Sequence, residues 1–251
     1  LMWLRTTMNY QYRYGTTTTV ALKTLYQEGG IPRFYRGLLP ALAQGPLSRF
    51  GDTAANAGVL SYLNSNEVTK DLPVAVKTAC ASATSASWRV ALMPIDAVKT
   101  ILQVEGKPGF NILMQKIKTN GIRVLFHGTA ATFAANMVGH FPWFFTYNYL
   151  DHHLPKSTET LYKLGRSAVM GFTASVVSDT CSNSIRVIKT TKQTSKEAIT
   201  YYQAVRMVVD KDGWIGLFGR GLKTRIITNG LQGLMFSVMW KLFDEKLFGH
   251  K

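Results

Sequence analysis

Charged residues are scarce in this chain of 251 residues, and acidic residues are the scarcest. Asp, Glu, Lys and Arg together make up 17% of the sequence, whereas an ordinary globular protein carries roughly 25%. Only 14 acidic residues stand against 29 Lys and Arg, so the net charge is +15. Nucleic-acid modules gather their cations on one face or tail. Here the cations lie scattered at the ends of apolar segments, which predicts no nucleic-acid partner and favours an anionic membrane surface or anionic solutes.

Cysteine and the common catalytic motifs are also nearly absent. Cys80 and Cys181 lie in apolar segments rich in small residues, without the spacing of a zinc or redox site, so we interpret both as buried helical residues. No glycine-rich nucleotide loop follows a strand-like run, and no Ser/His/Asp or Cys/His set is present. No cleavable signal pattern is visible. The sequence therefore predicts a protein that is not an enzyme and holds no cofactor or metal.

One phrase occurs three times along the chain. It reads Glu28-Gly29 with Arg36-Gly37, Asn120-Gly121 with His127-Gly128, and Asp212-Gly213 with Arg220-Gly221. The first glycines stand at 29, 121 and 213, so each step is 92 residues; the second glycines give steps of 91 and 93. Solenoid repeats have periods of about 20 to 50 residues. The chain is therefore built from three copies of one large unit.

Five apolar stretches of at least 20 residues recur around these phrases. They cover about 38–63, 73–98, 129–150, 164–188 and 222–243. A helix of about 20 residues crosses a hydrocarbon core of about 30 Å. Each stretch mixes Gly, Ala, Ser and Thr with a few polar residues, which suits helices that pack closely around an aqueous cavity. The alternative is a soluble protein with ordinary amphipathic helices.

Three shorter segments, 18–28, 110–118 and 202–210, repeat apolar residues at three- and four-residue steps. They are too short to span a membrane and predict helices lying at its surface. The second and third units then hold two spans each, whereas the first shows only one, and we expect its other helix to lie upstream of Leu1. The prediction is an all-α membrane protein of three two-helix repeats with threefold pseudosymmetry, forming one transmembrane domain with units at 1–70, 71–158 and 159–251.

Pro94, Asp96 and Lys99 follow one another at the end of the second unit's first span, with Gln103 behind them. Proline removes a backbone hydrogen bond and kinks a helix, and an acid and a base three residues apart share one helix face. This stretch resembles the Pro-x-Asp/Glu-x-x-Lys/Arg signature of the mitochondrial carrier family. The glycine phrases resemble that family's second signature, and the resemblance runs in register along the whole chain.

The resemblance implies a ring of ion pairs that closes the matrix side of a central cavity until bound substrate weakens it. The third unit reads Ser184, Arg186 and Lys189 at the matching positions, and the first unit is expected to place Trp3 where the base belongs. A complete ring cannot form. We expect Asp96 to pair with Lys189 or Arg186, and Lys99 with a residue outside the chain. The expected matrix-gate residues are Pro94, Asp96, Lys99, Ser184, Arg186 and Lys189.

Substrate contacts in that family lie seven and eight residues after the second glycine of each phrase. Counting in this chain gives Gln44 with Gly45, Ala135 with Asn136, and Thr228 with Asn229. These positions are largely polar and uncharged. Arg49 and Asp52 lie nearby as intramembrane ionisable residues; they are either cavity contacts or a mutually satisfied pair three residues apart.

Two functions follow from the resemblance. The first is a multi-pass solute carrier of the mitochondrial inner membrane that moves a small metabolite by alternating access. The alternative is a carrier-derived structural subunit of a larger mitochondrial membrane complex, with transport reduced or lost and other subunits as partners. In both cases membrane lipids are expected partners, with cardiolipin as a candidate for the basic loops.

Overall fold

The computed structural model describes residues 1–155 and 160–247, and every regular element in this part of the chain is a helix. The first unit contains α1, α2 and α3, which cover Met2–Tyr14, Thr18–Phe34 and Leu38–Ser65. The second contains α4, α5, α6, the short 3-10 helix η1 and α7, which cover Val74–Ala91, Met93–Glu105, Pro108–Asn120, Ile122–Phe126 and Thr129–His153. The third contains α8, α9 and α10, which cover Thr160–Thr194, Tyr201–Gly219 and Leu222–Leu247.

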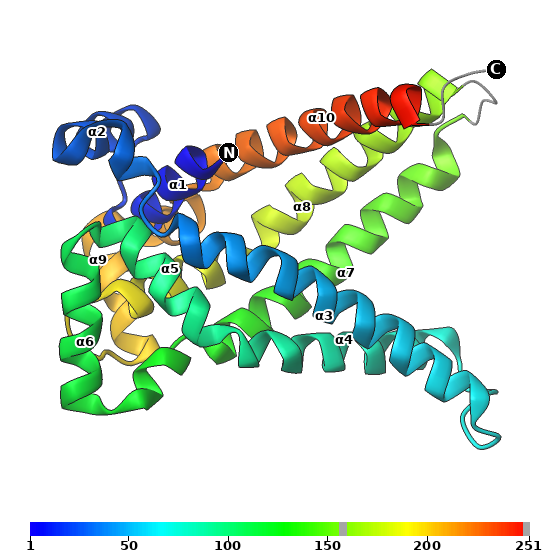
Figure 1. Ribbon diagram of the computed structural model, residues 1–251, viewed down its shortest axis with the longest axis horizontal. Coiled ribbons are helices and arrows are strands. Elements are labelled where there is room, and N and C mark those ends of the chain that lie inside the picture. The colour runs from blue at the N-terminus through cyan, green and yellow to red at the C-terminus, as the bar shows by residue number, and fades with distance from the viewer. Residues whose placement is uncertain (156–159, 248–251) are drawn as a thin grey trace.

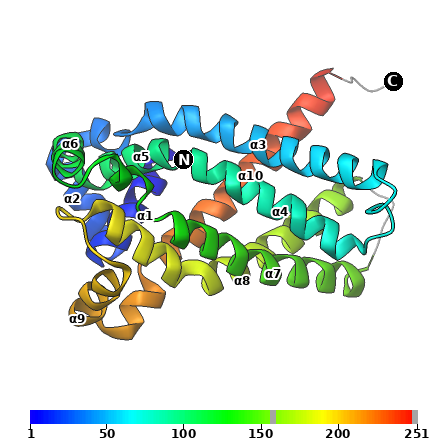
Figure 2. The same cartoon turned by 90° about the horizontal axis from the view of Figure 1, so that it is seen from below.

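The long helices share one end of the molecule and spread toward the other (Figure 1). The shorter helices α2, α6 and α9 gather at the shared end, on the left in both views (Figure 2). At the far end α3 and α4 diverge from the group formed by α7, α8 and α10. This arrangement, in which each unit contributes an amphipathic helix to the same end, confirms the predicted all-helical architecture of three units.

The second glycine of each phrase begins the unit's last helix for a conformational reason. Gly37, Gly128 and Gly221 have φ values of 80°, 97° and 66°, in the left-handed region that only glycine adopts freely. Each also lies against a helix of another unit, namely α5, α8 and α1 in turn. A Cβ on Gly37 would lie 3.0 Å from the Lys99 carbonyl oxygen of α5, and one on Gly221 would lie 3.2 Å from the Met8 carbonyl oxygen of α1.

The second apolar stretch is not the single helix that its length predicts. It divides into α4, which ends at Ala91, and α5, which begins at Met93. Pro94 sits at the start of α5, where its missing N–H costs nothing, whereas inside a continuous helix it would remove a hydrogen bond. The third unit carries Ser184 at the matching position, and α8 runs unbroken through it.

The first unit does contain the end of its first helix, because α1 occupies the place that α5 takes in the second unit. Both helices have 13 residues and end at a left-handed glycine, Gly15 or Gly106. Gly37 approaches Lys99 of α5, and Gly221 approaches Met8 of α1 in the same way. Met8 therefore takes the position in the first unit that Lys99 takes in the second. The expectation that Trp3 takes the base position is therefore wrong: with the proline and the acid both replaced, the sequence held no marker for the register.

Buried cations tie the units into a closed cycle. Arg33 of α2 donates to the carbonyl oxygens of Gln103 and Val104 at the end of α5, at 2.8 and 2.6 Å. Arg220 donates in the same way to Tyr12 and Arg13 at the end of α1, at 3.3 and 3.2 Å. Each binds an acid of its own unit, Glu28 at 2.8 Å and Asp212 at 2.7 Å.

The tie from the second unit to the third has different chemistry. The second unit has Asn120 where the others carry an acid, and here the buried Lys116 of α6 donates to the Gln193 carbonyl oxygen at 3.2 Å. A single ammonium hydrogen bond thus replaces a guanidinium that reaches two carbonyl groups. This single contact is weaker than the ties of Arg33 and Arg220, since Arg offers a fork of five donors.

Two further predictions concern the surface of the molecule. Cys80 and Cys181 are free and exposed, so the expectation of buried cysteines is wrong; their helix faces point away from the packed interior. Across residues 1–155 and 160–247, no helix has both the length and the apolar character needed to cross a membrane.

Candidate substrate cavity and gate

A cavity of about 420 Å³ lies where the first helices of the three units meet. Side chains of α1, α3, α5, α8 and α10 line it, together with Arg89 of α4. Three of the predicted contact residues, Gln44, Thr228 and Asn229, are on this wall. So are Asp96, Lys99, Arg186 and Lys189 of the predicted gate.

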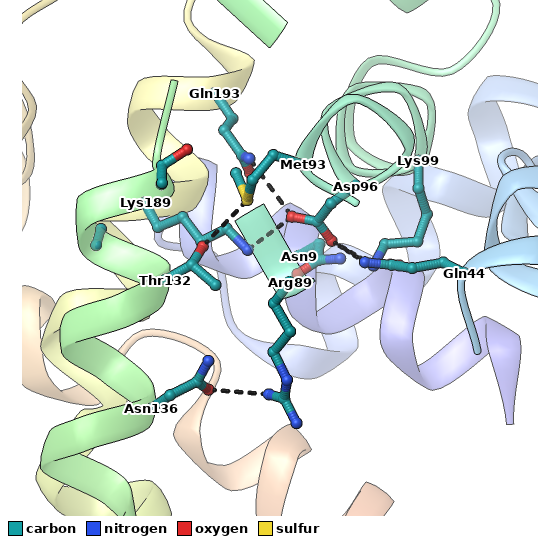
Figure 3. A network of polar contacts seen from close by, with 12 residues as sticks. Asn9, Gln44, Arg89, Met93, Asp96, Lys99, Thr132, Asn136, Lys189 and Gln193 are labelled. Atoms are coloured by element: carbon teal, nitrogen blue, oxygen red, sulfur yellow. Dashed lines mark hydrogen bonds and ion pairs between the residues drawn. The ribbon is translucent and has the colours of Figure 1, made fainter. Parts of the chain in front are cut away.

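Asp96 is the centre of the polar network at this cavity (Figure 3). Its carboxylate is buried and binds Lys99 of its own helix at 2.7 Å and Lys189 of α8 at 2.6 Å. The pairing of Asp96 with Lys189 confirms that expectation. The Lys99 expectation is wrong, because this ammonium group binds Asp96 and the Gln44 side-chain oxygen. One carboxylate thus joins two cations across two units.

Two glutamines complete this network from neighbouring helices. Gln44 of α3 donates to Asp96 at 2.9 Å while it accepts from Lys99, so its amide holds both members of the pair. Gln193 of α8 donates to the other Asp96 oxygen at 3.4 Å. Gln44 was predicted as a substrate contact; the structure places it on the cavity wall and also inside the gate.

The three positions that match Asp96 in the three units carry one acid and two arginines. Since Met8 matches Lys99, Arg5 stands three residues before it, as Asp96 stands before Lys99 and Arg186 before Lys189. Arg5 donates to the Gln232 amide oxygen at 2.9 Å, and Arg186 donates to the Ser182 hydroxyl at 3.3 Å. In the described part of the chain neither guanidinium binds a carboxylate.

Two more of the predicted contacts lie in a second, adjoining pocket. Ala135 and Asn136 of α7 line a space of about 330 Å³ with Trp143, Ser178 and Arg186. Arg186 reaches both spaces. In the cavity itself, the Thr228 hydroxyl is satisfied by the Thr224 carbonyl oxygen of its own helix at 2.6 Å.

Arg49 and Asp52 are neither a mutual pair nor a shared cavity contact. Asp52 binds Arg89 of α4 through both carboxylate oxygens, at 3.1 and 2.6 Å, and Arg89 reaches on to the Asn136 oxygen at 3.2 Å. Arg49 is exposed and lies outside the lining of the cavity. The three-residue spacing predicted a local pair, but the planar guanidinium of Arg89 offers the carboxylate a bidentate partner from another helix.

On the opposite wall, Asp179 of α8 holds two residues of α10. It binds Arg225 at 2.6 Å and accepts a hydrogen bond from the Asn229 amide. Asn229, a predicted contact, is therefore oriented by this carboxylate at the cavity wall. These contacts link α8 to α10, as the pair of Asp52 and Arg89 links α3 to α4.

Outside the apolar spans, two basic groups at the end where α2, α6 and α9 gather have altered proton affinity. Burial lowers the pKa of Lys116 to about 8, and the nearby charge of Arg13 adds to the shift. Burial also lowers the pKa of His127, with Lys192 and Lys116 contributing. Among the described residues, the buried His127 Nδ1 atom has no hydrogen-bond partner. Both residues belong to the second unit's joint with the third.

Sequence patterns missed several residues that shape this site. Arg5, Met8 and Tyr12 lie on α1, whose register the altered signature concealed. The end of α1 carried one usable signal: Gly15 and Gly106 are 91 residues apart, close to the period of the phrases. Arg33 lacked such a signal, because the phrase contains Arg36 at the more conspicuous place beside Gly37.

Comparison with known proteins agrees with this arrangement. The family model described as "Mitochondrial carrier protein" matches residues 70–158 and 161–251. A protein of Dictyostelium discoideum named "Mitochondrial substrate carrier family protein E" is 28% identical over 169 residues, which covers 59% of this chain and 55% of the relative. "Mitochondrial substrate carrier family protein D" of the same organism is 27% identical over 151 residues, or 53% of this chain and 44% of the relative. The chain thus spans about half the length of these curated relatives.

Proposed function

This chain belongs to the mitochondrial carrier family, and on that premise we propose that it moves a small solute across the mitochondrial inner membrane by alternating access. The family consists of transporters rather than enzymes. Asn136, Thr228 and Asn229 are the proposed contacts, because their polar groups lie on the walls of the two spaces, and we assign Gln44 of the same wall to the gate. We retain 1–70, 71–158 and 159–251 as the proposed units.

The observation that carries this proposal is the position of Asp96. It lies beside the central cavity, and its bonds to Lys99 and Lys189 join the second unit to the third. A protein is strongly destabilised when a buried carboxylate loses its partner. The two units therefore stay together on this side unless another group replaces those bonds, which a solute bound in the cavity can supply.

In this mechanism Asp96, Lys99 and Lys189 form the matrix-side gate. Solute contacts on the cavity wall compete for Lys99 and Lys189, so the free energy that holds α5 to α8 falls when the cavity is occupied. The kink between α4 and α5 lets α5 move without displacing α4, since Pro94 already interrupts the helix there. Cavity sites at a repeat interface are typical of such transporters.

The outer surface supports a membrane location. Large apolar side chains face outward along the long helices; Phe50 of α3 is 68% exposed and Phe141 of α7 is 75% exposed. Exposed apolar surface of this kind marks contact with a partner or a lipid phase. The amphipathic helices α2, α6 and α9 gather at one end of the molecule. Their basic residues suit contact with anionic lipid head groups, and cardiolipin is a candidate lipid.

The test is exchange by purified protein in liposomes, against a panel of labelled nucleotides, keto acids, amino acids and inorganic ions. We expect saturable uptake of at least one class above protein-free liposomes. Absence of uptake by protein that still melts cooperatively would contradict the proposal.

One observation favours the structural alternative. Two of the three acid positions of the gate carry arginine, and the first unit's base position carries Met8. A subunit that no longer transports does not need a closing ring. That alternative predicts stable association with other chains in mild detergent, whereas a carrier is expected to purify without them.

A further inference from the structure

Two arginines stand at gate positions where this family's pattern places carboxylates, and both line one cavity. Arg5 lies on α1 and Arg186 on α8, each three residues before the base position. From their positions we propose that they form an anion-binding site, and that the solute is a small anion with at least two negative charges on carboxylate or phosphate groups. This inference rests on the proposed carrier function, because it assigns the solute of that cavity.

The charge balance around the cavity supports an anion. Six cationic side chains line it: Arg5, Arg89, Lys99, Arg186, Lys189 and Arg225. Three carboxylates bind members of this set, namely Asp52, Asp96 and Asp179. Six cations against three carboxylates leave three positive charges unmatched. Charge focused in a cleft raises the local concentration of oppositely charged solutes.

The unmatched charges can be assigned to individual residues. Arg89 is matched by Asp52, and Arg225 by Asp179. Asp96 serves both Lys99 and Lys189, so this group keeps one excess charge. Arg5 and Arg186 supply the other two, since each binds only a neutral oxygen among the described residues. The excess is therefore concentrated at the three gate positions.

Arg186 has donors available for a ligand. Its Nε donates to Ser182, and no bond in the described chain occupies its two terminal nitrogens. The residue is half-buried and borders both the central cavity and the pocket of Asn136. A guanidinium with free terminal nitrogens binds carboxylate or phosphate in a bidentate manner. Arg225 lines the same cavity as Arg5 and Arg186, so the three cations surround a common space.

This site has a consequence for the gate. In the family's pattern carboxylates of the protein close the ring; here a bound dianion would supply negative charge beside Arg5 and Arg186 while competing with Asp96 for Lys99 and Lys189. The ligand would therefore draw the first and third units together as it loosens the bond between the second and third. Solute binding and gate movement are coupled through the same cations.

The experiment measures the melting temperature of the purified 251-residue chain in mild detergent with malonate or inorganic phosphate. Chloride at the same ionic strength and glucose serve as the monovalent and neutral comparisons. A ligand that binds the folded state raises its melting temperature by mass action. We expect a rise with at least one dianion that chloride and glucose do not produce.

Variants test whether the rise in melting temperature comes from the site of Arg5 and Arg186. Arg186→Gln and Arg5→Gln should each weaken the apparent affinity about tenfold, as expected for loss of a charge-assisted hydrogen bond. Arg186→Lys should retain part of the affinity. Arg123→Gln removes the same charge from an exposed position on η1 and should leave the rise unchanged. Equal rises in all four variants would overturn the inference.

Liposome uptake of the same labelled anion separates this inference from the carrier proposal. Binding without uptake upholds the site and contradicts transport. Uptake of a neutral solute that is insensitive to Arg5→Gln and Arg186→Gln upholds transport and overturns the anion site. A protein that binds and transports the dianion, with both activities reduced by the two variants, upholds both.

Discussion

Asp96 of α5 and Lys189 of α8 meet at 2.6 Å, with most of both side chains shielded from solvent. The contact joins the second unit to the third beside the cavity. Its neighbour Lys99 approaches the same carboxylate from within α5 at 2.7 Å. In the proposed gate a single carboxylate therefore balances two ammonium groups.

Replacement of this acid is expected to destabilise the protein. Asp96→Asn keeps the size of the side chain but leaves Lys99 and Lys189 without a negative partner, and breaking a buried pair costs about 3–5 kcal/mol. The melting temperature should fall by about 2–4 °C per kcal/mol for a chain of this length. Asp52→Asn is the matched control: Asp52 pairs with Arg89, and about a third of each of these side chains is exposed, so its effect should be clearly smaller.

Gln44 should matter more for the gate than for the solute. Its amide donates to Asp96 and accepts from Lys99, and Gln44→Ala removes both hydrogen bonds to charged groups, each worth about 1.5–3 kcal/mol. We expect a lower melting temperature without ligand and little change in ligand affinity. Thr228→Ala, at another predicted contact, loses only a bond to its own helix. It serves as the comparison for the melting temperature without ligand. A large loss of affinity in Gln44→Ala with an unchanged melting temperature would assign Gln44 to the solute instead.

The ties between units predict a contrast between two arginines of one phrase. Arg33→Met leaves Glu28 and the carbonyl groups of Gln103 and Val104 without their donor. Hydrogen bonds to charged groups contribute about 1.5–3 kcal/mol each, so the melting temperature should fall by several degrees. Arg36→Met removes the same charge three residues later, where the described part of the chain shows no such bond. Equal effects of the two substitutions would contradict the role of Arg33.

Lys116 gives the joint between the second and third units a defined pH dependence. Its pKa in the folded protein is about 8, below its ordinary value of 10.5, so the unfolded chain binds more protons between these values. Stability should therefore rise as the pH increases from about 8 to 10.5. The neutral amine can still donate to Gln193, so the joint persists.

Lys116→Met isolates this effect from other titrating groups. The difference in melting temperature between the variant and the natural chain should favour the variant most at pH 7 and shrink as the pH rises toward 10. Lys118→Met, at an exposed position of the same helix, should show no such trend. A difference that stays constant across this range would contradict the lowered pKa.

Much of the fold could be predicted because it depends on local signals. Glycines 92 residues apart marked the three units, and Pro94 marked the break between α4 and α5. The bond from Asp96 to Lys189 followed from the family's pattern. These features rest on backbone conformation and on a repeated phrase, both of which can be read directly along the chain.

The rest depends on contacts between distant segments. Asp52 has Arg49 three residues away, yet it binds Arg89, which lies 37 residues along the chain. The match of Arg5 with Asp96 required the approach of Gly221 to Met8, which only the folded chain displays. Arg186 was predicted as a gate residue, but that it shares one cavity with Arg5 is visible only in the folded chain.

The most direct test of the gate is a double-mutant cycle on Asp96 and Lys189, measured as the rate of anion uptake in liposomes. The variants are Asp96→Asn, Lys189→Met and the two combined. Residues that act as one unit give strongly non-additive losses. We predict that each single variant slows uptake at least about tenfold, and that the double variant is no slower than the slower single one. Losses that simply multiply in the double variant, or single variants that transport at the natural rate, would contradict the account.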